Sequence, residues 1–112
     1  MLFHVVPLAD WAADPEGPYR PPSLASEGFV HCSADGAAAL AVADAHYRRV
    51  PGPLLALVVD EERLSADVRW EGTPGGTVFP HVYGPVERAA VVALLEVRRG
   101  PDGEALELVP WG

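Results

Sequence analysis

The sequence contains no lysine and only one cysteine, and both deficits limit what the protein can be. A single thiol, Cys32, cannot form an intrachain disulfide, so nothing in the sequence indicates an oxidising compartment. The eight basic residues are all arginines and face sixteen acidic residues, which gives a formal net charge of -8. Because affinity for nucleic acid is built largely from clustered positive charge, an RNA or DNA partner is disfavoured.

Long apolar runs and metal-ligand pairs are missing as well. Even the strongly apolar run 54–59 ends at Asp60, well short of the roughly 18 residues that a membrane-spanning helix needs. The first residues lack the basic lead and apolar run of a signal peptide. No pair of histidines or cysteines has the short spacing typical of zinc ligands. We therefore expect a cytoplasmic protein without membrane contact or a metal site.

The 112 residues show no repeat and no linker, which indicates one domain over residues 1–112. Prolines and glycines separate short segments whose patterns predict secondary structure. Strands are predicted at 2–6, 29–32, 54–59, 68–71, 78–83, 91–97 and 105–109, a short helix at 8–13 and a long helix from 34 to about 49, capped by Ser33. Residues 14–27 are expected to form a long surface connection, and 72–77 a plain hairpin loop. The fold class is α+β: a mixed, largely antiparallel sheet with one main helix and short helices.

Three predicted strands each carry one histidine at an interior-looking position. Because side chains alternate along a strand, His4 shares a face with its apolar neighbours, His31 shares one with Phe29 and Ser33, and His81 shares one with Tyr83. If the strands are neighbours, the histidines face one cleft; otherwise each is a satisfied structural residue.

The other chemically interesting residues each have a plain structural interpretation. Glu71, at a strand end, is either a general base, an acceptor for ribose hydroxyls, or simply an exposed carboxylate. Cys32 points away from His31 and is interpreted as a buried, inert thiol. His46 is expected on the surface of the long helix. A nucleophilic hydrolase is poorly supported, since the G-x-S-x-G pattern is absent.

Three segments resemble a known family. They read YRPPSLASEGFVHCS from Tyr19, VRWE from Val68 and FPHVYGP from Phe79, and they resemble the bacterial domain-of-unknown-function family 952. That family is similar in fold to the ADP-ribosyltransferases and, in motif order, to the NAD-dependent RNA 2′-phosphotransferases. The resemblance implies an NAD-binding cleft that His4 and His31 line from the first and second strands.

Two departures from these relatives affect the implied activity. The glutamate that protein-modifying transferases carry on a later strand is not matched in the corresponding segment 79–83. The RNA 2′-phosphotransferases have several arginines in the cleft and a basic accessory domain, whereas this acidic chain has only Arg20 and Arg69 near the motifs. An RNA substrate is therefore disfavoured again.

These considerations define the expected site and leave two classes of function open. We expect the cleft to bind NAD or a related small phosphorylated metabolite, with histidines orienting ribose hydroxyls and the nicotinamide amide, and Arg20 neutralising a phosphate. The catalytic candidates are His31, His81 and Glu71; the cofactor-binding candidates are His4, Arg20, Ser33 and Tyr83. The enzyme hypothesis is an ADP-ribosyl or phosphoryl transferase or a glycohydrolase. The alternative is a non-catalytic module that recognises a protein or another small metabolite.

Overall fold

The computed structural model describes residues 1–72 and 74–112, which fold into an α+β arrangement. In chain order the elements are β1 (Leu2–Pro7), α1 (Leu8–Ala12), α2 (Pro22–Glu27), β2 (Val30–His31), α3 (Gly36–His46), β3 (Leu54–Val59), the 3-10 turn η1 (Glu61–Arg63), β4 (Val68–Gly72), β5 (Val78–Val82), the 3-10 turn η2 (Arg88–Ala90), β6 (Val91–Arg99) and β7 (Ala105–Pro110). None of the helices in the described part of the chain is long and apolar enough to cross a membrane.

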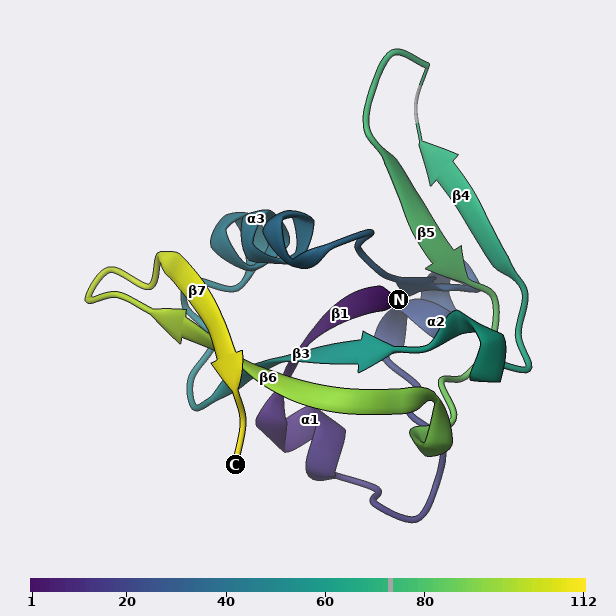
Figure 1. Ribbon diagram of the computed structural model, residues 1–112, viewed down its shortest axis with the longest axis horizontal. Coiled ribbons are helices and arrows are strands. Elements are labelled where there is room, and N and C mark those ends of the chain that lie inside the picture. Colours follow the sequence, from purple (N-terminus) through teal and green to yellow (C-terminus); the bar gives the residue numbers. More distant parts are fainter. Residues whose placement is uncertain (73) are drawn as a thin grey trace.

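The strands form two antiparallel sheets, which corrects the expectation of one mixed sheet. One sheet has the strand order β1-β3-β6-β7 and the other β2-β5-β4. A single bridge connects β1 to the segment after β2, through hydrogen bonds of 2.9 and 2.7 Å between the backbones of Phe3 and Ser33. The chain then turns into α3, so the pairing cannot extend into a common sheet. The β4–β5 hairpin consequently projects from the rest of the molecule (Figure 1).

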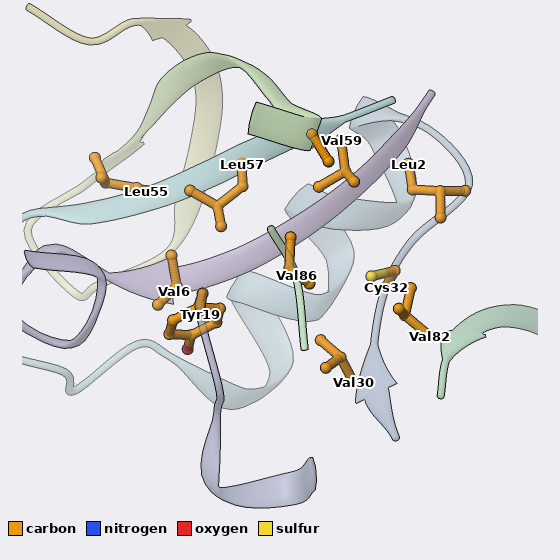
Figure 2. Packing of buried hydrophobic residues seen from close by; sticks show 11 residues of the cluster. Leu2, Val6, Tyr19, Val30, Cys32, Leu55, Leu57, Val59, Val82 and Val86 are labelled. Carbon is orange, nitrogen blue, oxygen red and sulfur yellow. The ribbon is translucent and has the colours of Figure 1, made fainter. Parts of the chain in front are cut away.

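Strand β3 is the centre of the larger sheet and is covered on both faces, as its continuous apolar sequence predicts. Leu55, Leu57 and Val59 belong to one buried cluster, which extends to β2 and β5 (Figure 2). Leu54 and Ala56 belong to a second cluster, against α3. Full burial of one such leucine contributes about 1.5–3 kcal/mol to stability, so the two clusters hold the sheet from both sides.

The main helix is present but starts and ends differently from the prediction. Asp35, not Ser33, caps α3: its Oδ1 accepts a hydrogen bond of 2.8 Å from the backbone N–H of Ala38. The backbone of Ser33 is instead occupied by the bridge to β1. The helix ends at His46 rather than near Arg49.

A second helix, α2, lies within the segment that the sequence analysis assigned to a loop. Pro22 occupies its first turn, where a missing N–H costs no hydrogen bond. Gly28 ends it with φ at 88°, the left-handed conformation typical of a helix C-terminus. Both signals are present in the sequence, but a six-residue helix has too short a pattern to be distinguished from a turn-rich loop.

The predicted hairpin is confirmed in its two strands. Glu71 of β4 is paired with Phe79 of β5, and Gly72 with Val78. The predicted loop 72–77 includes Thr73, which lies outside the described residues.

Candidate functional site

A cleft of about 540 Å³ lies between β1, the segment around α2, β2 and α3. This is within the range of cavities that bind small organic ligands. Its polar and aromatic lining includes His4, Asp10, Tyr19, His31, Ser33 and Tyr47. No arginine among the described residues lines it.

His4 lies at the floor of this cleft in a defined protonation state. Burial lowers its pKa to about 4, although a hydrogen bond to the His31 backbone acts in the opposite direction. The imidazole is therefore neutral at pH 7, and Nδ1 carries its proton because it donates to the carbonyl oxygen of His31 over 2.6 Å. Nε2 is left as a hydrogen-bond acceptor.

The Nε2 nitrogen of His4 is not completely buried, and the residue lines the cleft. No buried side-chain nitrogen or oxygen in the described part of the chain lacks a hydrogen-bond partner. His4 Nε2 makes no hydrogen bond to a described residue, so it cannot be fully buried, although only 7% of the residue surface is exposed. Because His4 lines the cleft, we infer that Nε2 is exposed to the cleft.

Two tyrosines and one carboxylate lie with His4 on the lining of the cleft. The Tyr19 ring centroid lies 5.6 Å from that of His4, in a tilted arrangement. Burial raises the pKa of Tyr19 and Tyr47, and the negative charge of Asp10 raises both further. Both phenols therefore stay protonated and can donate hydrogen bonds. The only carboxylate on the cleft lining among the described residues is that of Asp10.

His31 connects the cleft to the smaller sheet. Its side chain, 54% exposed, lines the cleft and its Nε2 is 2.8 Å from Glu27 Oε2 on α2. Ser33, two residues on, is buried but also reaches the lining. These two candidates and His4 are the ones that the structure brings together.

Glu71, His81 and Tyr83 form a separate group on one face of the smaller sheet. The Tyr83 hydroxyl donates to Glu71 Oε1 over 2.5 Å, and His81 Nδ1 lies 2.9 Å from the same oxygen. The Tyr83 hydrogen bond, followed by that of His81, lowers the pKa of Glu71. Phe29 stacks on the His81 ring, with centroids 4.1 Å apart. None of these four residues lines the cleft.

The expectation of three histidines in one hollow is therefore correct for two and wrong for the third. His4 and His31 share the cleft, while His81 lies outside it with its ring centroid 5.2 Å from that of His31. The reason is topological: β2 pairs with β5, and this pairing places His31 directly opposite His81 on the smaller sheet.

The site candidate Arg20 and the other arginine near the motifs, Arg69, lie outside the cleft. Arg20 is exposed and lines a shallow hollow next to it, in which Asp10 and Tyr19 also take part. The guanidinium of Arg69 lies 4.5 Å from the centre of the Tyr83 ring.

Cys32 and His46 lie as the sequence predicts. The Cys32 sulfur lies among buried apolar side chains (Figure 2), and burial raises the pKa of its thiol to about 12. His46 is exposed at the end of α3. Both residues also belong to the lining of the cleft, which the sequence did not indicate. In the described part of the chain, no group of three histidine, cysteine or acidic side chains is placed to hold a metal ion.

Sequence reasoning missed Asp10, Tyr19, His46, Tyr47 and Phe79 of the lining. Tyr47 lies at helical spacing from the apolar residues Leu40 and Ala43 of the predicted long helix, a pattern typical of a core residue. Tyr19 lies in an irregular segment, where no periodicity indicates the direction of a side chain. The length of the connection 14–27 is the only signal in that segment, because long surface loops are often functional.

Comparison with known proteins gives the chain a family and a structural relative. The crystal structure of protein CC0527 from Caulobacter crescentus is 31% identical, with a TM-score of 0.77 over 94% of this chain and 92% of that one. The solution NMR structure of the same protein is also 31% identical, with a TM-score of 0.72 over 91% of this chain and 88% of that one. A search of curated proteins found no match. The model of a family described as "Protein of unknown function (DUF952)" matches residues 5–94, and the chain belongs to this family.

Proposed function

We propose that the cleft binds NAD or a related phosphorylated nucleotide metabolite. The observation that carries this proposal is the neutral His4 imidazole, whose Nε2 opens at the floor of a cavity of ligand size. A desolvated acceptor nitrogen favours a ligand that brings a hydrogen-bond donor, because an unpaired polar group in such a site costs free energy. The carboxamide and the ribose hydroxyls of NAD are donors of this kind.

The charge of the lining supports an oxidised nicotinamide ring as the part held inside. Asp10 contributes a negative charge, while His4 is neutral and both tyrosines stay protonated. A positively charged aromatic ring is favoured by such a carboxylate and by the faces of aromatic side chains. Phosphate groups are not favoured at this position.

The phosphates would instead lie over the neighbouring hollow. It shares Asp10, Tyr19, Pro21 and Pro22 with the cleft, so one extended ligand can span both. Arg20 is exposed there and can form bidentate hydrogen bonds to a phosphate. The other arginine of the hollow, Arg88, already donates to three backbone carbonyls. Arg20 is thus the proposed phosphate ligand.

Thermal unfolding with and without NAD tests this proposal. A ligand at one hundred times its dissociation constant adds about 2.7 kcal/mol of stability, so the melting temperature should rise clearly. His4→Gln should remove most of the shift and Arg20→Gln should reduce it. His81→Gln is the matched control, because His81 lies outside the cleft, and it should retain the shift. If NAD, ADP-ribose and AMP all leave the melting temperature of the unmodified protein unchanged, the proposal is wrong.

A further inference from the structure

Strand β4 is an edge of the smaller sheet, and its outer side has no partner strand in the described part of the chain. The order of that sheet is β2-β5-β4, and Figure 1 shows β4 as the outer strand of the projecting hairpin. An uncovered edge strand exposes a row of backbone N–H and C=O groups, which is a template for pairing with another strand. The outer side of β4 can therefore accept a further strand.

The hydrogen bonds of the hairpin determine which residues of β4 face outwards. The backbone N–H of Tyr83 donates to the carbonyl oxygen of Asp67 over 2.8 Å, so these two residues form a hydrogen-bonded pair. Such pairs alternate with non-hydrogen-bonded pairs along an antiparallel ladder. Pro80 of β5 fits this alternation, because its carbonyl oxygen accepts from Cys32 on the other side of the hairpin. The residues of β4 whose backbone groups point to the open side are therefore Val68, Trp70 and Gly72.

The sequence of β4 is complementary to itself when two copies run antiparallel about Trp70. The outward backbone groups then meet one another, with Trp70 opposite Trp70 of the second copy and Val68 opposite Gly72. In the same register Arg69 lies opposite Glu71 of the second copy, and symmetry repeats this pair. Opposite charges directly across two strands stabilise their pairing, whereas like charges destabilise it. One register thus satisfies both the backbone and the charged side chains.

The side chains of β4 are available for this pairing. Trp70 is 51% exposed, although it is a large apolar residue. Arg69 and Glu71 share the other face of the strand, and the Arg69 guanidinium lies over the Tyr83 ring without an ion pair to a described residue. Glu71 accepts from Tyr83 and His81 through Oε1, and both hydrogen bonds lower its pKa. Its Oε2 has no hydrogen-bond partner among the described residues, so this carboxylate can accept from an arginine of a second copy.

The edges of the larger sheet do not show this complementarity. Glu107 is the only charged residue of the edge strand β7, so two antiparallel copies would bring acidic groups together without a basic partner. β7 also ends with Pro110, which has no N–H to donate. At the opposite edge, β1 is partly covered by its bridge to Ser33. The edge that fits a second copy is therefore β4.

We propose that two copies of this chain form a two-fold symmetric dimer through β4, with Trp70 at the axis. The two three-stranded sheets then join into one continuous antiparallel sheet. The assembly closes at two chains, because both copies use the same surface. The pairing involves only five residues of each copy, so the dimer forms in a concentration-dependent way. It is independent of the proposed ligand, since none of the described residues Val68–Gly72 lines the cleft.

Sedimentation equilibrium over a range of protein concentrations tests the proposal. The solution contains about 0.15 M salt, which screens the repulsion between two chains of net charge -8. The mass should rise with concentration from the 11.9 kDa of one chain towards twice that value. A mass of one chain up to about 1 mM, or growth beyond two chains, would overturn the proposal.

Reversal of single charges tests the register. Arg69→Glu places carboxylates opposite each other on both sides of the axis, and Glu71→Arg places guanidinium groups there. Either variant alone should have a dimer dissociation constant higher by about tenfold or more. An equal mixture of the two variants restores opposite charges at both places and should dimerise again, as should the double variant Arg69→Glu/Glu71→Arg. Arg98→Glu, at another exposed strand arginine, is the matched control and should leave the dimer unchanged.

Substitution at the axis gives a second test that leaves Glu71 and its hydrogen bonds in place. Trp70→Pro removes the outward N–H, and proline is tolerated where the N–H of an edge strand faces solvent. Trp70→Thr removes the same indole but keeps the N–H. The proline variant should be monomeric at concentrations where the threonine variant still dimerises. Persistence of the dimer in Trp70→Pro, equal effects of Arg69→Glu and Arg98→Glu, or a mixture of folded variants that stays dissociated would each overturn the proposal.

Discussion

The surroundings of His4 determine both its charge and its tautomer. Alternation along β1 puts it on the same face as Leu2 and Val6, both members of a buried cluster. In this position the charged form is disfavoured, and the hydrogen bond to the His31 carbonyl selects the tautomer. One histidine therefore serves as part of the interior and as an acceptor at the floor of the cleft.

The depressed pKa of His4 predicts a specific pH dependence of stability. The folded pKa is about 4, against 6.5 for the unfolded residue. Between these values the unfolded chain binds the proton and the folded chain does not, so the free energy of unfolding should fall as the pH decreases from about 6.5 to about 4. The contribution of His4 to this fall is about 3 kcal/mol.

Urea unfolding of the unmodified protein and of His4→Gln at several pH values measures this contribution. The variant cannot titrate at this position, so the stability difference between the two proteins should change by that amount between pH 7 and pH 4. Carboxyl groups that titrate in the same range cancel in the comparison. A difference independent of pH would show that the pKa of His4 is the same in the folded and the unfolded protein.

Close approaches between elements, rather than element propensities, account for the geometry at the end of α3. The guanidinium of Arg99 on β6 donates to the carbonyl oxygens of Tyr47, Val50 and Gly52, just after the helix. Gly103, in the turn between β6 and β7, passes so close to the Arg48 carbonyl that a Cβ atom would lie 2.2 Å from its oxygen. Helix end and hairpin turn are therefore held against each other.

A comparison of two glycines with similar backbone conformations measures the effect of this close contact on stability. Gly103 and Gly52 have φ values of 82° and 76°, so alanine is strained by about 1–2 kcal/mol at either position. At Gly52 a Cβ would meet no atom within 4 Å, whereas at Gly103 it would overlap with backbone. Gly103→Ala should therefore cost about 1–3 kcal/mol more than Gly52→Ala in urea unfolding. Equal losses of stability in the two variants would mean that the turn moves away from the Arg48 carbonyl without further cost.

At the scale of the whole molecule, the cleft depends on an irregular segment that is held from a distance. Arg88 of η2 donates to the carbonyl oxygens of Trp11, Asp14 and Gly17 over 2.6–2.8 Å, and its guanidinium lies 4.0 Å from the Trp11 ring centre. A bridge between Tyr19 and Val86 follows directly. Arg88 and Val86 thus hold residues 11–19 in place, and this attachment positions Tyr19 at the cleft.

Arg88→Lys should release this segment, because an ammonium group cannot reproduce the fork of the guanidinium. We expect a loss of about 2 kcal/mol in the free energy of unfolding. Amide hydrogen exchange at residues 11–19 should become faster than in the unmodified protein. Arg98→Lys is the matched control, since Arg98 forms only an exposed ion pair with Glu107, and it should cost less than 1 kcal/mol. Similar exchange in both variants would show that Arg88 does not hold the segment.

Patterns within a single element predicted much of this fold. The apolar run 54–59 is the central strand, and Leu40, Ala43 and Tyr47 of the predicted long helix pack in or against the second core cluster. The predictions failed where a residue distant in sequence determines the local structure. Ser33 does not cap the helix because Phe3 pairs with its backbone, and α2 replaces a predicted loop.

The sequence by itself determined the α+β class, the position of most strands, the buried thiol and the interior face of His4, because each follows from the alternation or clustering of neighbouring side chains. Only the tertiary structure decided that there are two sheets, that His4 and His31 share a cleft with two tyrosines, and that His81 joins Glu71 outside it. Strand pairing connects residues far apart in the chain, and the free energy that selects one pairing over another comes from contacts that no local pattern contains.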